Sequence, residues 1–479
     1  MKFSQVLKNK VVFYLASRYI TYAIQFVSSL VIAAKLGPYY MGIWGFILLI
    51  IQYFQQIHFG IVNSFNVLYV HHRDNEQDCN NYIVNSLLLI SYLALIVVGF
   101  YLYYIIVGIK GFYKYSVDGY ITWICLIAVL QYFVQFFITL FRVKNMLTSV
   151  IFCQSIIVFL NFVCIFFVEG EKLIQWLVVG YVVGNLLCVI LAFMSGSIPN
   201  FRNVNVSISC QKEILKKGLY LFLYNSCFYF IIISIRTIIS GHYTVGEFGT
   251  FTFSFTLAHA ILLLLEALAF IIFPKVIGLL SSSDKEKVAA TINMLRSIYI
   301  TSAHLLIYIA LICFPFLLWF FPKYEGALAV LNFIALTILM NYNSYGYLDF
   351  LIAQNKEKTS AFLSFGALIV NCTIALLGVV CFHWQYEHVI LATLVTYLLF
   401  SATVVFFACR LLKQNFALEK WFPVRLMIPY ITALLISFYQ LTNYIFIPLF
   451  IFILLNWQQM QEIKTTASLL LKQPDKINL

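Results

Sequence analysis

The stretch GPYYMGIWG at residues 37–45 recurs as GHYTVGEFG at residues 241–249. Both copies fit the pattern G-x-Y-x-x-G-x-[aromatic]-G, and each copy follows a long apolar stretch and leads into another. Weaker matches follow in the same order, such as an Asp-x-Glu at 74–76 and again at 284–286. Because the matches keep a common order, they favour an ancient duplication. The sequence therefore predicts two related halves.

The composition is that of a membrane protein. Of the 479 residues, 63% are hydrophobic and 10% are charged, and the mean hydropathy is +0.93. A typical soluble domain is about 45–50% apolar and about 25% charged, so soluble enzymes and nucleic-acid-binding proteins are excluded. Most of the 11 cysteines lie inside apolar runs, where cysteine behaves as a small hydrophobe, and no Cys-x-x-Cys or Cys/His cluster predicts a metal site.

A spanning helix needs about 20 mostly apolar residues, and cutting the chain at its polar clusters predicts fourteen spans. They cover 11–34, 41–70, 82–109, 119–141, 148–168, 173–194, 217–240, 247–273, 294–321, 325–348, 360–382, 387–409, 425–441 and 443–457. The first is too long for a signal-peptide core, so we expect it to be retained as a helix. The last two are short and closely spaced, and they would also fit one re-entrant hairpin.

These spans predict an all-α polytopic membrane protein, with two six-helix lobes followed by two additional C-terminal helices. The expected divisions are an N-lobe at 1–194, a cytoplasmic linker between the lobes at 195–216, a C-lobe at 217–409, and the additional helices with a cytoplasmic tail at 410–479. The connections between spans are short, so no soluble domain is expected.

Lysine and arginine are distributed unequally between the two sides of the membrane. If the N-terminus is cytoplasmic and the spans alternate, 22 of the 30 Lys and Arg residues lie on cytoplasmic segments, five lie on the opposite side and three lie within spans. This positive-inside bias predicts cytoplasmic termini, and it explains most of the net charge of +12 without an anionic partner. Both halves then begin on the cytoplasmic side, so the repeat is expected to be parallel, with a pseudo-two-fold axis along the membrane normal.

Polar side chains line up along the first two spans of each half. In hydrocarbon such a stripe must face protein or water. The stripes are Arg18, Thr21, Tyr22, Gln25, Ser28 and Ser29 in the first span; Gln52, Gln55, Gln56, Asn63 and Asn66 in the second; Asn225, Tyr229, Arg236 and Ser240 in the seventh; and Thr252, His259 and Glu266 in the eighth. Their equivalent positions in both halves predict a water-filled cleft between the lobes. The alternative is that these residues only join helices through hydrogen bonds.

Three charged residues within these spans are the sharpest pointers to function, because a charge at mid-helix costs roughly 2.5–3.5 kcal/mol. Arg18 and Glu266 each lie roughly 10 Å from the cytoplasmic end of their helix, so we expect them to face each other as a closing ion pair. Arg236 lies near the outer end of its span, where it would line the cleft or extend to the interface. His259 is deeper, and it would either titrate near neutrality or stay neutral and hydrogen-bonded.

The residue types in the stripes suit a phosphorylated, sugar-bearing ligand. Guanidinium groups match phosphate oxygens in a bidentate way, while amides and tyrosines suit sugar hydroxyls and ring faces. The candidate cavity residues are Arg18, Tyr22, Gln25, Gln52, Gln56, Asn63, Asn225, Tyr229, Arg236 and His259. Glu266 and Arg18 are candidates for ion coupling or for a gate. No catalytic constellation or phosphate loop is found, so we expect a transporter and not an enzyme, and no ATP-driven mechanism in this chain.

An arginine-containing first span followed by LGPYYMGIWGF at 36–46 resembles the start of the bacterial polysaccharide flippases that carry O-antigen or capsule repeat units. These belong to the multidrug/oligosaccharidyl-lipid/polysaccharide exporter (MOP) superfamily. The resemblance implies a MATE-like fold of twelve core helices with two extra ones, and a central cavity lined by spans one, two, seven and eight. It also implies transport of an undecaprenyl-diphosphate-linked oligosaccharide to the periplasmic leaflet of the bacterial inner membrane by alternating access. The family's cationic cavity residues correspond best to Arg18 and Arg236.

Other readings stay open at this point. A cation-coupled multidrug exporter and a murein-precursor flippase belong to the same superfamily. A polysaccharide polymerase or ligase is a different class, but it needs a large periplasmic loop, and the longest outer segment here, 110–119, is only ten residues long. No cofactor is expected, although a proton or sodium ion could be coupled through Glu266. The implied partners are the lipid-linked oligosaccharide, the bilayer, a polysaccharide polymerase and a chain-length regulator.

Overall fold

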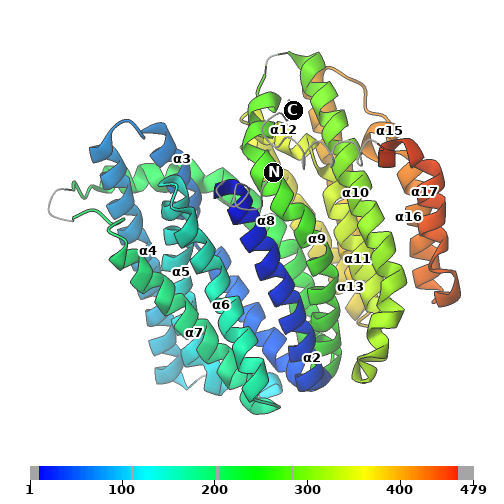
Figure 1. Ribbon diagram of the computed structural model, residues 1–479, viewed down its shortest axis with the longest axis horizontal. Coiled ribbons are helices and arrows are strands. Elements are labelled where there is room, and N and C mark those ends of the chain that lie inside the picture. The colour runs from blue at the N-terminus through cyan, green and yellow to red at the C-terminus, as the bar shows by residue number, and fades with distance from the viewer. Residues whose placement is uncertain (1–9, 109–112, 201–203, 283, 462–479) are drawn as a thin grey trace, which may run out of the picture. The chain divides into compact units, whose positions relative to one another are not determined.

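The computed structural model describes residues 10–108, 113–200, 204–282 and 284–461, and within helices it leaves out the side chains of 10–12, 15, 221, 262–275 and 277. Every regular element in the described part is a helix, which confirms the all-α class. The chain divides into two compact units (Figure 1). Unit 1 comprises Met1–Ser226 and Thr244–Gly249, and unit 2 comprises Cys227–Tyr243 and Thr250–Leu479. The lobe boundaries expected from the sequence remain predictions, but the division between the units falls inside a helix and not in the expected linker at 195–216.

Unit 1 is built mainly from long apolar helices. They are α2 (Lys10–Gln56), α3 (Ile61–His71), α4 (Glu76–Val107), α5 (Ile121–Val143), α6 (Leu147–Phe167), α7 (Glu171–Met194) and the first part of α8 (Ile208–His242), with short 3₁₀ turns η1 (Tyr113–Tyr115) and η2 (Asp118–Tyr120). Helices α2, α5, α6 and α7 pack against one another. Within the expected linker at 195–216, the segment 208–216 is helical and forms the first part of α8.

The first expected span and the first part of the second form one element, α2, which is broken at the first copy of the repeated motif. Gly37 has φ 67° and ψ 175°, outside the helical region, and Pro38 follows it. Positive φ is readily adopted by glycine, and proline removes a backbone donor, so the two residues together place the break. The chain therefore turns at the position where the sequence separates the spans 11–34 and 41–70.

The second expected span is itself interrupted, which corrects one prediction. Helix α2 ends at Gln56, and α3 begins after Gly60, whose φ is 75°. Asn63 and Asn66 therefore lie on α3, whereas the three glutamines of the predicted stripe lie on α2. The prediction that these five residues share one face of one helix is wrong, because hydropathy over 41–70 does not register a short break between two apolar segments.

Unit 2 is arranged around a largely buried helix, α11, in which every residue from Val330 to Met340 is buried. Around it pack α10, α14 and α16. The helices of this unit are the rest of α8, α9 (Val245–Leu280) from Thr250 onward, α10 (Lys285–Trp319), α11 (Ala327–Asn341), α12 (Tyr347–Ala353), α13 (Glu357–Val380), α14 (Ile390–Leu412), α15 (Leu418–Trp421), α16 (Val424–Phe438) and α17 (Ile447–Leu455), with 3₁₀ turns at Pro322–Tyr324, Tyr342–Ser344 and Thr442–Tyr444.

One helix in each half of the sequence, α4 and α10, begins with the same kind of side-chain cap. Asn75 caps α4 by accepting hydrogen bonds from the backbone N–H groups of Gln77 and Asp78, and Asp284 caps α10 in the same manner. Side-chain caps of this kind satisfy backbone donors at a helix start. The weak sequence match at 74–76 and 284–286 is thus shifted by one residue, because the structurally equivalent position in the first half is Asn75.

In the described part of the chain, ten helices are long and apolar enough to cross a membrane. The expected eighth span coincides with α9, which is 36 residues long. Helices α16 and α17 have 15 and 9 residues, or about 22 Å and 14 Å, against an apolar core of about 30 Å. They pack against each other, so a hairpin describes them better than two complete spans.

Candidate functional site

The two copies of the repeated motif contact each other within unit 1. A Cβ atom added to Gly249 would lie 1.8 Å from the carbonyl oxygen of Pro38, and one added to Gly42 would lie 2.1 Å from the carbonyl oxygen of Val245. Only glycine leaves room for backbones this close. At Gly241 and Gly246, by contrast, an added Cβ would meet nothing within 4 Å. The motif therefore encodes a close crossing of α2 with the start of α9, which the sequence marked as a repeat but did not reveal as a contact.

The stripe on α2 serves two purposes. Thr21 lies 2.7 Å from Ser155 of α6, Oγ1 to Oγ, and this contact joins helices, as the alternative interpretation proposed. Arg18 instead donates from Nη2 to the hydroxyl of Tyr22 at 2.6 Å, with its guanidinium carbon 4.6 Å from the centre of that ring. Among the described residues Arg18 forms no ion pair. It is half-buried, and Gln25, one turn beyond Tyr22, is exposed.

The glutamines and asparagines of the second stripe are likewise divided. Gln55 donates to Oε1 of Gln131 on α5 at 2.8 Å, so it joins two helices of unit 1. Gln52, Gln56 and Asn63 are half-buried. Their place in a cavity wall stays a prediction, with Asn63 contributed by α3.

In unit 2, Arg236 is buried, with only 3% of its surface exposed. Its guanidinium carbon lies 5.4 Å from the ring centre of Phe255 on α9. The ring of His259, four residues further along α9, also stacks with Phe255, at 5.7 Å with an interplanar angle of 7°. Phe255 thus contacts both a cation from α8 and an imidazole from its own helix, and each of these aromatic contacts favours a defined geometry.

The remaining predicted site residues are placed as follows. Asn225 is exposed and Tyr229 is half-buried, both on α8. Glu266 belongs to α9, and its side chain lies outside the described residues. The closing ion pair between Arg18 and Glu266 and the cleft between the lobes therefore stay predictions.

Sequence reasoning missed a polar network inside unit 2. Asn371 of α13, which is fully buried, donates from Nδ2 to the carbonyl oxygen of Ile231 and to Oγ of Ser234, both at 2.9 Å. Thr393 of α14 donates to Oδ1 of Asn371 at 3.0 Å. The network joins α8, α13 and α14. The only signal in the sequence was a lone asparagine in an apolar run, which in a membrane must find partners within the protein.

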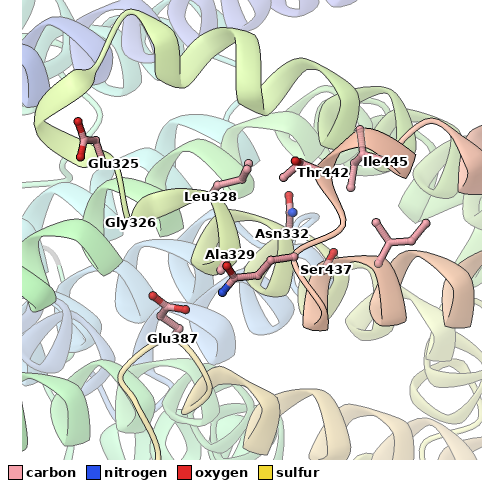
Figure 2. Close-up of a pocket in the computed structure, with 11 residues that line it drawn as sticks. Glu325, Gly326, Leu328, Ala329, Asn332, Glu387, Ser437, Thr442 and Ile445 are labelled. Atoms are coloured by element: carbon pink, nitrogen blue, oxygen red, sulfur yellow. The ribbon is translucent and has the colours of Figure 1, made fainter.

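Unit 2 also contains an acidic cavity of about 370 Å³ that no sequence pattern suggested (Figure 2). Its polar lining includes Glu325, Glu387 and Asn332, and burial raises the pKa of Glu387. Asn332 is 4% exposed, and its Oδ1 has no hydrogen-bond partner. The side chains come from the start of α11, the segment between α13 and α14, and the turn between α16 and α17. These segments are distant in sequence, so only folding brings them together.

No protein-family profile matches the sequence, and no curated protein matches it. Among solved structures, "Lipid II flippase MurJ, inward closed conformation" has a TM-score of 0.68 at 12% identity, covering 95% of this chain and 100% of that one. An inward-facing multidrug resistance MATE family transporter of the MOP superfamily has a TM-score of 0.62 at 12% identity, covering 83% and 98%. Its outward-facing counterpart has a TM-score of 0.59 at 15% identity, covering 86% and 98%. The chain has the MATE fold.

The MATE fold confirms the fold class predicted from the spans and the repeat. Together with the ten long apolar helices, it makes the chain a multi-pass membrane protein. At these identities the likeness establishes the fold alone. The transported substrate must therefore be argued from this chain's own residues.

Proposed function

We propose that this chain is a flippase that moves undecaprenyl-diphosphate-linked oligosaccharides from the cytoplasmic to the periplasmic leaflet by alternating access. The observation that carries the proposal is Arg18, a half-buried cation within a membrane span that pairs with a tyrosine hydroxyl and with no carboxylate among the described residues. Within the described residues this guanidinium has no counter-charge, which favours an anionic ligand, and its geometry matches a diphosphate; the side chain of Glu266, its expected partner, lies outside those residues.

Each part of the proposed substrate would meet a different chemistry. The Arg18–Tyr22 pair would hold the diphosphate, since both groups can donate hydrogen bonds to phosphate oxygens. The exposed Gln25 and the half-buried Gln52 and Gln56 suit sugar hydroxyls, while the polyprenyl chain stays in lipid. Arg236 is buried against Phe255 in this conformation. We therefore expect its positive charge to attract the diphosphate without direct contact, unless a movement of α8 and α9 exposes the side chain.

Two features favour a flippase over a multidrug exporter. The lipid II flippase structure aligns with 95% of this chain, whereas the two MATE transporter structures align with 83% and 86% of it. In addition, α2 has no acidic residue along its length, whereas cation-coupled exporters commonly place a carboxylate in the first lobe. A murein-precursor flippase is the second candidate, favoured by the same alignment. The MATE fold lends no support to a polymerase or ligase.

The proposal is tested by replacing Arg18 with Ala, Gln and Lys in cells whose surface polysaccharide depends on this protein. We expect Ala and Gln to abolish polysaccharide assembly at unchanged membrane levels, and Lys to restore part of it. Lys35→Gln is the matched control, because Lys35 lies on the same helix but is paired with Glu169 at 3.2 Å. Normal polysaccharide in the Arg18→Ala cells would refute the diphosphate site.

The candidates are separated by three readouts of the unmodified protein. Polysaccharide export restored in a flippase-deficient host supports the proposal. Rescue of cells depleted of their lipid II flippase would instead identify a murein-precursor flippase. Increased resistance to cationic drugs without either rescue would identify an exporter.

A further inference from the structure

A basic cavity of about 290 Å³ lies in unit 2, where the first half of α10 meets α15 and the start of α16. Its charged lining consists of Arg296, Lys420 and Arg425 against a single carboxylate, Glu419. None of these residues belongs to the polar stripes of α2, α3, α8 and α9. The cavity is therefore separate from the proposed transport site, and what it binds does not depend on the proposed function.

Arg296 forms the buried wall of this cavity. It is 8% exposed, and it donates hydrogen bonds to the backbone carbonyl oxygens of Asn343, of Tyr345 at 3.2 Å and of Trp421 at 3.0 Å. Its guanidinium carbon also lies 4.9 Å from the ring centre of Tyr347. All these partners are neutral, so they hold the guanidinium in place without compensating its charge. A buried cation without a counter-charge is costly, and a bound anion would relieve that cost.

The other two cations are not neutralised either. Lys420 donates to Oε1 of Gln414 at 2.9 Å and to the carbonyl oxygen of Asn415 at 3.1 Å, both neutral. Arg425 has a buried Nε with no hydrogen-bond partner. Glu419 accepts from the backbone N–H of Val424 at 3.3 Å. Within the described ranges Glu419 forms no ion pair with either cation, so the cavity keeps a net positive charge.

Further groups in the lining fit an oxyanion. Thr301 is fully buried, its Oγ1 has no partner, and it lines the cavity together with Asn293 and Ser297. The cavity also adjoins the first turn of α16, a helix of 15 residues whose N-terminus carries a partial positive charge. Hydroxyl and amide donors, cations that have only neutral partners and a helix N-terminus are the usual means by which proteins bind phosphate.

We propose that this cavity binds the phosphate of an anionic phospholipid headgroup. The apolar side chains beside it support a lipid as the source, because Leu418, Val424 and Ile428 are 45%, 43% and 41% exposed on the same segment. On a multi-pass membrane protein, side chains of this kind face acyl chains, so a phosphate in the cavity would belong to a lipid at the interface. Basic pockets between transmembrane helices are known sites for anionic headgroups on the cytoplasmic side. The distribution of Lys and Arg between the loops predicts that the start of α10 lies on that side.

The test uses the purified full-length chain in detergent, titrated with phosphatidylglycerol, phosphatidylcholine or inorganic phosphate and followed by native mass spectrometry and by the melting temperature. We expect retained phosphatidylglycerol adducts and stabilisation by that lipid alone. Lys420→Gln and Arg425→Gln should each weaken phosphatidylglycerol binding about tenfold, the loss expected for one charge-assisted hydrogen bond. Arg410→Gln is the matched control, since Arg410 is exposed at the end of α14 and does not line the cavity.

Three results would overturn the proposal. Equal binding of phosphatidylglycerol by all variants would show that the lipid binds elsewhere. Equal binding of phosphatidylcholine would show that the headgroup charge is not recognised. Competition by inorganic phosphate at equal concentration would identify free phosphate as the ligand. If Arg425→Gln does not fold, Lys420→Gln still decides, because the hydrogen-bond partners of that lysine, Gln414 and Asn415, are both exposed.

Discussion

The sharpest prediction concerns Gly249 in the second copy of the repeated motif. In a Gly249→Ala variant the new methyl group would lie 1.8 Å from the carbonyl oxygen of Pro38 and 2.7 Å from the backbone nitrogen of Gly42. An ordinary contact requires more than about 3.2 Å, and both neighbours are backbone atoms that no rotamer change can move. The two backbones must therefore separate by about 1.5 Å at their crossing.

The cost can be estimated from the effect of inserting a methyl group into a packed site, which is typically about 1–3 kcal/mol. A clash with backbone on two sides belongs at the upper end, so we expect a loss of about 3 kcal/mol, or roughly a hundredfold in the folding equilibrium. The melting temperature of the purified protein in detergent measures this loss. Transport should fall with it, because α2 carries the proposed ligand-binding arginine.

The same motif copy supplies its own controls. At Gly241 and Gly246 an added Cβ meets nothing within 4 Å, so Gly241→Ala and Gly246→Ala should melt at or above the temperature of the unmodified chain, helped by the higher helix propensity of alanine. Gly42→Ala should behave like Gly249→Ala, since its Cβ would lie 2.1 Å from a backbone oxygen. If Gly249→Ala melts and transports like Gly246→Ala, the close crossing does not exist in the folded protein.

Three further predictions follow from other contacts. Asn371→Ala should destabilise unit 2 by about 1–3 kcal/mol in thermal unfolding, because it leaves buried partners unsatisfied, whereas Thr373→Ala on the same helix, whose hydroxyl bonds only within α13, should change little. Burial raises the pKa of Glu387, so the folded protein holds the proton of this carboxyl group more tightly than the unfolded chain does. The resulting stabilisation of the folded state is fully present below the pKa of Glu387 in the unfolded chain, and it is lost as the pH rises through the pKa in the folded protein. Glu387→Gln should therefore flatten that part of the stability–pH profile measured between pH 4 and 8, and an unchanged slope would contradict the burial. Asn75→Ala should cost about 1 kcal/mol by removing the α4 cap, and Asn75→Asp should restore it, as judged by the same melting assay.

Much of the fold was predictable because its determinants are local. Span positions depend on the hydropathy of about 20 consecutive residues, and the repeat is visible as a pattern of glycines and aromatics. Hydropathy summed over such a window does not detect a short interruption between two apolar segments, such as the one between Gln56 and Ile61. Hydropathy also predicts spans where the helices are too short, since neither α16 nor α17 is long enough to cross a membrane by itself.

The candidate site was only partly predictable, because a stripe on a helix shows which face is polar but not what it meets. Thr21 and Gln55 join helices, whereas Arg18 holds only a tyrosine hydroxyl. Arg236, placed near a helix end by the sequence, is buried against Phe255. These differences depend on which neighbouring helix faces the stripe.

The amino-acid sequence by itself determined that this chain is an all-helical membrane protein with a duplicated core, since apolar run length, repeated motifs and loop charge are properties of contiguous residues. The tertiary structure alone decided why the motif glycines are needed, which polar residues join helices, and which cations have no counter-charge among the described side chains. Pro38 meets Gly249, and Arg296 meets Trp421, across more than a hundred intervening residues. Contacts of that kind arise from packing: the sequence marks the glycines of the repeat, but not which backbone atoms each glycine meets.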